Sequence, residues 1–141
     1  MINLSDYIAV GQNSMFNKTV QHSDTSESYS SGLKNLLATP KLIHMAIEAA
    51  MQAIDPYLPE EYMSVGISTS FTHTAPTSLG MTVTVRATVI ALDGNDVLFD
   101  IKAWDEQGDI GHGLHKRAIT TKQDIEEKTA LRSRFLTNRQ Y

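Results

Sequence analysis

The fold of this chain is decided by residues 38–56, which read ATPKLIHMAIEAAMQAIDP. Thr39 is a preferred N-cap residue and Pro40 suits the first helical position, so we expect a helix over residues 40–55 that ends before Pro56. Its polar residues form one narrow stripe, and every other position is apolar. The stripe consists of Lys41, His44, Glu48, Gln52 and Asp55. So wide an apolar arc is typical of a helix surrounded by protein.

Runs with the apolar alternation of β-strands flank this helix. A short strand is expected before it, over residues 15–20. Four longer runs follow, over residues 64–74, 81–92, 97–104 and 110–121. The second and third runs are joined by Asp93-Gly94-Asn95-Asp96, a strong hairpin turn. One buried helix and a meander of antiparallel strands predict an α+β domain, with a curled sheet wrapped around one long central helix.

Length and composition indicate a single domain over residues 1–141, with a core at about 10–121 and a peripheral helical tail at 122–141. The net charge of −4 gives no support to nucleic-acid binding. The chain has no cysteine, which excludes disulfides, thiolate chemistry and cysteine-ligated zinc. No apolar run is long enough to span a membrane, and no signal peptide is evident. We therefore expect a cytoplasmic protein without membrane or nucleic-acid partners.

One histidine and one hydroxyl stand out as candidate catalytic groups. His73 ends a β-patterned run beside the turn at residues 76–80, and an imidazole fixed by a hairpin is a candidate acid–base group. It shares strand parity with Val65, Ile67 and Phe71, so we expect it to face the apolar side. A hydrogen-bonded core histidine is the structural alternative. Thr39 lies 34 residues earlier, and helix capping is its structural alternative.

The remaining polar candidates have weaker support. Glu48 lies one helical turn after His44, which is typical of an exposed or interface pair. A metal site on these two residues would need a third ligand, so no metal is predicted. His112 and His115 lie three residues apart in one strand and therefore face opposite sides. Residues 21–34 are rich in Ser, Asp, Thr and Gly and predict a loop or lid.

Several motifs together resemble a known family. They are Ala38-Thr39-Pro40, Val65-Gly66, residues 72–77 with Gly80, residues 82–85, and residues 113–117. Their combination and spacing, over roughly residues 10–120, resemble the hot-dog fold and, more narrowly, the thioesterases related to fluoroacetyl-CoA thioesterase. The resemblance implies a homodimer or a higher assembly, with acyl-CoA sites near the subunit interface. It also implies hydrolysis of a small or medium acyl-CoA thioester, with no cofactor besides the coenzyme A of the substrate.

The resemblance assigns roles residue by residue. It implies that Thr39 and His73 are catalytic, that Gly66 is a close-packed strand glycine at the substrate, and that Arg117 belongs to the substrate-binding site. An arginine suits the phosphates of coenzyme A, because it pairs with phosphate oxygens in a bidentate manner; a solvated strand end is the structural alternative. The catalytic glutamate of the family falls on Ile47, and Glu48, the next residue, is the third catalytic candidate.

Two questions stay open at the level of the sequence. Thr39 either attacks the thioester itself or orients a water molecule, with His73 as the base in both cases. The protein is either an enzyme or a non-catalytic dimeric module that binds acyl-CoA or another small ligand. The isoleucine at position 47 favours the non-catalytic module. A hot-dog hydratase or dehydratase is less favoured, because the usual Asp/His motifs for that chemistry are not found.

Overall fold

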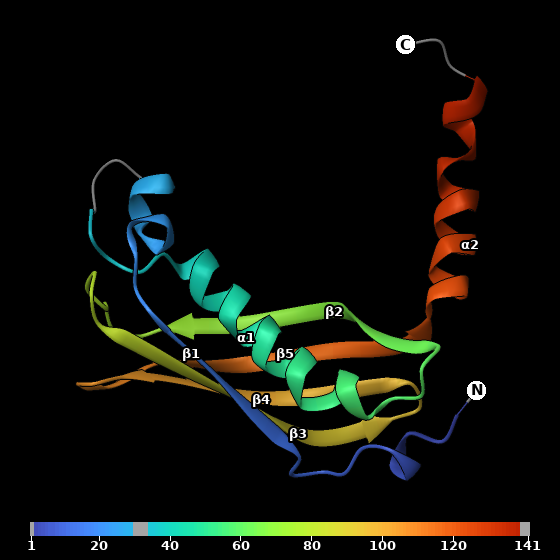
Figure 1. Ribbon diagram of the computed structural model, residues 1–141, viewed down its shortest axis with the longest axis horizontal. Coiled ribbons are helices and arrows are strands. Elements are labelled where there is room, and N and C mark those ends of the chain that lie inside the picture. Colours follow the sequence, from blue (N-terminus) through green and yellow to red (C-terminus); the bar gives the residue numbers. More distant parts are fainter. Residues whose placement is uncertain (1, 30–33, 139–141) are drawn as a thin grey trace.

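The computed structural model describes residues 2–29 and 34–138. One long helix lies against a curled antiparallel sheet, and a second helix projects from the sheet (Figure 1). The elements are β1 (Asn13–Thr19), α1 (Thr39–Ile54), β2 (Tyr62–His73), β3 (Thr82–Asp93), β4 (Asp96–Asp105), β5 (Gly108–Thr121) and α2 (Lys122–Ser133). The strand order is β1-β3-β4-β5-β2. The predicted α+β arrangement is confirmed, and each strand boundary lies within two residues of its predicted place.

The core lies between α1 and the concave face of the sheet. Alternate residues of β3 and β4 are fully buried, since successive strand residues point to opposite faces. They include Val83, Val85, Ala87, Val89, Phe99 and Ile101. The helix meets them with a face rich in alanine, formed by Leu42, Met45, Ala46, Ala49, Ala50, Ala53 and Ile54. Small side chains on the helix let its axis come close to the strands, which excludes water from the core.

One flank of α1 is not covered by the chain. Ile43, Ile47 and Met51 follow each other at steps of four, and all three are only half-buried. The prediction of a helix surrounded by protein is therefore wrong for this flank of the single chain. The physical reason is that α1 packs chiefly on β1 and β3 and makes few contacts with β2. None of the helices in the described ranges has the length and apolar character to cross a membrane.

β2 is an edge strand that carries a bulge. Within the described residues it pairs with β5 alone. The register runs from Gly66 opposite Arg117 directly to Ser68 opposite Lys116, so Ile67 is the extra residue. The predicted inward direction of Ile67 is wrong, because the bulge interrupts the two-residue alternation and leaves this side chain 55% exposed.

A buried polar network joins β5 to β2. His115 is 2% exposed, and its Nδ1 lies 2.7 Å from Thr69 Oγ1 and 3.0 Å from the Ser68 carbonyl oxygen. Its Nε2 lies 3.2 Å from a guanidinium nitrogen of Arg117. Because a guanidinium only donates, Nε2 must accept, which places the ring proton on Nδ1. Arg117 also donates from Nε to Ser64 Oγ at 2.7 Å. The network therefore requires a neutral His115.

Two glycines of β5 permit close approach to β2. A Cβ atom at Gly111 would lie 2.7 Å from the Phe71 ring, and one at Gly113 would overlap the carbonyl oxygen of Ser70. At Gly66 the nearest atom to an added Cβ would be a guanidinium nitrogen of Arg117 at 3.5 Å, an ordinary contact. No atom of the described chain crowds Gly66, and its expected close packing at the substrate stays a prediction. The tight glycines lie in the partner strand.

Replacing Gly113 with alanine should lower the free energy of unfolding by about 2 kcal/mol or more, because the added methyl group must displace the backbone of β2. Gly66→Ala is the matched control and should change stability by less than about 1 kcal/mol, since its methyl group meets no atom closer than 3.5 Å. Urea denaturation of both variants measures the difference. Equal stabilities would contradict the close approach of β5 to β2.

The neutral state of His115 should make stability depend on pH. Burial lowers the pKa of His115 below its usual 6.5. The hydrogen bond to the Ser68 backbone opposes this shift, and the charge of Arg117 adds to it. Below pH 6.5 the unfolded chain therefore binds a proton at this histidine more readily than the folded chain does. We expect the free energy of unfolding to decrease as pH falls from about 6.5 toward the lowered pKa.

The test is the slope of unfolding free energy against pH in the His115→Gln variant, measured by urea denaturation. The slope should be smaller than in the wild type, although it will not vanish, because the pKa of His73 is also lowered. His112→Gln, which alters an exposed histidine of the same strand, should keep the wild-type slope. An unchanged slope in His115→Gln would contradict the requirement for a neutral ring.

Candidate active site

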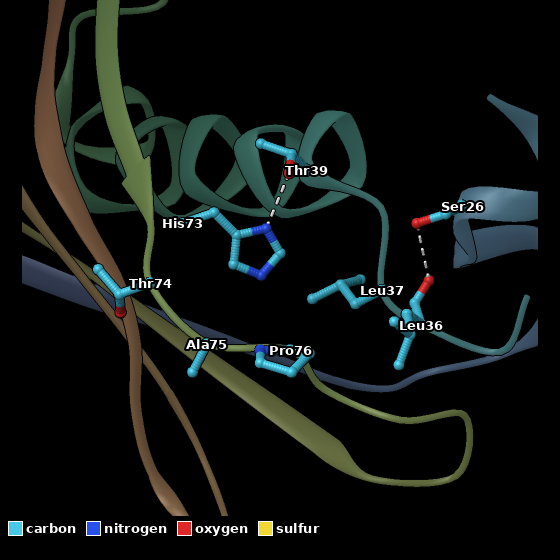
Figure 2. A pocket seen from close by; sticks show the side chains of 8 residues that line it. All are labelled: Ser26, Leu36, Leu37, Thr39, His73, Thr74, Ala75 and Pro76. Atoms are coloured by element: carbon cyan, nitrogen blue, oxygen red, sulfur yellow. Dashed lines mark hydrogen bonds between the residues drawn. The ribbon is translucent and has the colours of Figure 1, made fainter. Parts of the chain in front are cut away.

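Thr39 opens α1 but does not cap it. The N-cap is Ala38, which has extended backbone angles, and Thr39 is the first residue of the helix. The Thr39 hydroxyl instead lies 2.8 Å from Nδ1 of His73 (Figure 2). The predicted capping position of Thr39 is therefore wrong by one residue. This difference matters chemically, because a hydroxyl that is not engaged with the helix backbone can interact with the imidazole.

His73 is the last residue of β2 and is half-buried beside the start of α1. Burial lowers the pKa of His73 below its usual 6.5, and the backbone of Ala75 opposes this shift. The ring is therefore neutral at neutral pH. A neutral imidazole in contact with a hydroxyl has the geometry of a general base beside the group that it activates.

The two ring nitrogens of His73 have different surroundings. Nδ1 contacts the Thr39 hydroxyl, whereas Nε2 is buried and has no hydrogen-bond partner among the described residues. In the tautomer in which Nδ1 accepts from the hydroxyl, Nε2 carries the proton. Figure 2 shows Nε2 on the side of the ring that faces Leu37 and Pro76. A buried donor without a partner is uncommon and suits a site that a ligand completes.

The Thr39–His73 pair lies in the wall of a pocket of about 280 Å³. The other residues of its wall come from two segments that are distant in sequence, and they are Ser26, Leu36, Leu37, Thr74, Ala75 and Pro76. Most of these side chains are apolar, so the pocket combines one polar reacting pair with an apolar lining. The local sequence pattern gives no sign of Leu36 and Leu37, because nothing in it places them in one pocket with His73.

The segment before α1 is held over the pocket by defined contacts. The carboxylate of Asp24 accepts from Lys18 at 2.7 Å and from the Gln21 backbone at 2.9 Å. Isolated β-bridges join Thr25 to Leu37 and Leu36 to Ser78. The predicted lid over residues 21–34 lies partly outside the described residues. Of its described part, Ser26 lines the pocket.

Arg117 and Gly66 lie elsewhere than in this pocket wall. Arg117 is 4% exposed, and its guanidinium donates to the hydroxyl and the carbonyl oxygen of Ser64 and faces His115. Its contacts are therefore internal, and the single chain does not present it to a phosphate group. Gly66 is exposed and lies opposite Arg117 in the β2–β5 ladder. No local pattern identifies Ser64 and His115 as partners of Arg117, because these contacts depend on how β2 and β5 lie against each other.

Glu48 also lies away from the reacting pair in the single chain. It follows Thr39 by nine residues, which is a rise of about 13 Å along the helix. Its carboxylate lies 3.8 Å from His44 Nε2, as the i, i+4 spacing predicts. The charges of Asp55 and Glu48 oppose the effect of burial, which lowers the pKa of Arg117. Within residues 2–29 and 34–138 no three metal-ligating side chains lie together.

The sequence matches the family described as fluoroacetyl-CoA-specific thioesterase over residues 20–123. A curated relative, the fluoroacetyl-CoA thioesterase of Streptantibioticus cattleyicolor, is 32% identical over 102 residues, which cover 72% of this chain and 73% of the relative.

Solved structures extend this similarity to the fold. A hot-dog-like protein from Thermanaerovibrio acidaminovorans has a TM-score of 0.88 at 29% identity, over 93% of this chain and 97% of that one. A crystal structure of a fluoroacetyl-CoA thioesterase has a TM-score of 0.80 at 26% identity, over 88% of this chain and 96% of that one. Variants of that enzyme have been crystallised with acetyl-CoA and with fluoroacetate and CoA. The fold is therefore a hot-dog fold, and this chain belongs to the fluoroacetyl-CoA-specific thioesterase family.

Proposed function

We propose that this protein is an acyl-CoA thioesterase and that Thr39 and His73 carry out the hydrolysis. The observation that carries the assignment is the 2.8 Å contact between the Thr39 hydroxyl and Nδ1 of His73 in the wall of a largely apolar pocket. Membership of a thioesterase family and the acyl-CoA ligands of its relatives support the substrate class. The acyl group would enter the pocket, with the thioester carbonyl carbon beside Thr39.

In the first half of the reaction, His73 Nδ1 takes the proton of the Thr39 hydroxyl. The hydroxyl oxygen forms a bond to the thioester carbonyl carbon, and the C–S bond then breaks as the carbonyl reforms. The proton on Nδ1 passes to the departing sulfur, which releases coenzyme A as a free thiol. The acyl group is then held by Thr39 as an ester. Water attacks this ester with His73 again as the base, which releases the carboxylic acid and restores Thr39.

The negative charge that develops on the thioester oxygen needs hydrogen-bond donors. At the start of α1, the N–H groups of Lys41 and Leu42 already donate to the carbonyl oxygen of Ala38, and Pro40 has no N–H. The N–H of Thr39 is the backbone donor of this turn that we assign to the oxyanion.

Nε2–H of His73 is buried without a partner in the described residues and points away from the Thr39 hydroxyl, so it cannot reach this oxyanion; we assign it to a polar atom of the substrate farther from the reacting carbon. A substrate oxygen at this position would remove the cost of leaving a buried donor unsatisfied. The pocket volume and the leucine side chains suit a small or medium acyl group.

We also assign a homodimer to this protein. The long edge strand β2, with Ile67 and Met63 exposed at 55% and 37%, lies near the half-buried flank Ile43–Ile47–Met51 of α1. Exposed strand edges pair readily with another chain, and a second copy that pairs along β2 would cover this apolar flank.

Other assignments from the sequence stay predictions. They are the substrate-binding roles of Gly66 and Arg117, the catalytic role of Glu48, the absence of a separate cofactor and the cytoplasmic location.

Removal of the Thr39 hydroxyl should abolish the nucleophile. Thr39→Ala is expected to lower kcat for acetyl-CoA hydrolysis by about 100-fold or more, whereas Thr39→Ser keeps the hydroxyl and should retain most of the activity. Release of free thiol measures the rate. Thr72→Ala is the matched control, because Thr72 neighbours His73 in β2 but is exposed and does not line the pocket. Full activity in Thr39→Ala would overturn the site assignment, and no thiol release by the wild type would overturn the enzymatic function.

Trapping of the acyl group distinguishes the two roles of Thr39 that the sequence leaves open. Mass spectrometry of the enzyme quenched during turnover should show one acyl group on the peptide that contains Thr39. If the threonine only orients a water molecule, no acylated peptide appears at any quench time. At high enzyme concentration, thiol release then shows no initial burst either.

Activity should follow the titration of His73. Since burial lowers the pKa of His73 below 6.5, we expect kcat/KM to rise with pH through an apparent pKa below 6.5 and then to stay level above pH 7. A pH series of kcat/KM in the wild type measures this, with His112→Gln as a control that should leave the curve unchanged. An activity that falls as pH rises through this range would contradict a basic role for the ring.

A further inference from the structure

The C-terminal helix α2 has little packing against the described part of its own chain. It is 12 residues long and none of its residues is buried. Figure 1 shows it leaving the sheet beside the first residues of β2 and extending past the β2 edge. A short helix in water is only marginally stable by itself, because nucleation is costly and most helical stability comes from packing. The position of α2 therefore favours a contact that the single chain does not supply.

The far end of α2 combines apolar and basic side chains. Leu131 is 61% exposed, and Phe135 and Leu136, just beyond the helix, are 51% and 43% exposed. Lys128 and Arg132 lie four residues apart, so they share one face of the helix. The acidic residues of α2 lie nearer its start. A basic and apolar end of this kind suits an anionic ligand held against a protein surface.

Strand geometry indicates where this end would lie in a dimer. Thr121, the last residue of β5, lies opposite Tyr62 at the start of β2, whereas His73 is at the other end of β2. If β2 pairs antiparallel with β2 of a second copy, the Tyr62 end of one chain lies beside the His73 end of the other. The helix α2, which starts at the Tyr62 end and extends past the β2 edge, is thereby placed next to the pocket of the second copy.

We infer that α2 of each subunit docks beside the Thr39–His73 pocket of the other subunit and that Lys128 and Arg132 bind the phosphate groups of coenzyme A there. This inference rests on the proposed thioesterase function and on the homodimer. It accounts for the cations that a polyanionic substrate needs in a protein of net charge −4 whose buried Arg117 is engaged internally. Each site is then formed by two chains: one supplies the reacting pair, and the other the phosphate ligands.

Site-specific cross-linking tests the docking without any need for activity. The chain has no cysteine, so Leu131→Cys offers a single thiol for a photoreactive maleimide. In dimers assembled from ¹⁴N- and ¹⁵N-labelled chains, mass spectrometry should find the cross-link between chains, on residues 22–29, 34–38 or 74–78. Ile90→Cys, an exposed position on β3, is the matched control and should not react with these segments. Cross-links within one chain, cross-links to other segments, or a monomeric protein would overturn the docking.

Kinetics test the role of the two cations. Lys128→Glu/Arg132→Glu should raise KM for acetyl-CoA about tenfold, with little change in kcat, and should leave KM for acetyl-pantetheine unchanged because that substrate lacks the nucleotide. Lys102→Glu, on β4, is the matched charge reversal and should leave both values unchanged. An unchanged KM for acetyl-CoA, or an equal rise for both substrates, would overturn the phosphate role.

Mixed dimers show which chain supplies the cations. A dimer of one His73→Ala chain and one Lys128→Glu/Arg132→Glu chain has a single competent reacting pair, whose phosphate ligands come from the His73→Ala chain. Its KM should be that of the wild type, whereas a tenfold higher KM would place the cations on the same chain as the pair. If the wild type releases no thiol, the proposed function fails, and the cross-link and calorimetric titration with coenzyme A still decide the docking.

Discussion

The close packing of an alanine-rich helix face on the valine-rich strand β3 is the constraint on which the rest of the structure depends. It sets the height of α1 above the sheet, and therefore the position of its first residue relative to the end of β2. With a larger side chain at Ala46, Ala49 or Ala50, the helix would be lifted from the sheet. Thr39 and His73 are 34 residues apart in sequence, and the 2.8 Å contact between their side chains is thus a consequence of core packing.

The two buried histidine environments show how one residue type serves two purposes in the same sheet. His115 is satisfied on both ring nitrogens by Thr69, Ser68 and Arg117, so its neutral form is part of the structure. His73 is satisfied on one nitrogen only, and its second nitrogen is buried without a partner in the described residues. Burial lowers the pKa of both rings, yet only the ring with the free donor is equipped to meet a ligand. Environment, and not residue type or pKa alone, separates the structural from the catalytic candidate.

Three features of the single chain leave apolar side chains exposed at or near the β2 edge of the sheet. The β2 edge, the apolar flank of α1 and the exposed helix α2 each leave apolar groups in contact with solvent. The homodimer proposed above, with a second copy paired along β2, would account for all three with one symmetry operation. The bulge at Ile67 lies near the middle of β2, where such a pairing would be centred, and increases the local twist of the edge.

The sequence by itself determined the α+β class and the strand boundaries to within two residues, because periodicity and turn residues are local properties. The resemblance to a known family joined Thr39 and His73 as catalytic candidates. Only the tertiary structure decided that Thr39 follows the N-cap, that Ile67 points outward, that Leu36 and Leu37 line the same pocket as His73, and that Arg117 is held by Ser64 and His115. Each of these depends on strand register or on contacts between distant segments. A local pattern cannot encode a one-residue bulge, or which residues of a neighbouring strand lie opposite each other, because both are set by packing over the whole sheet.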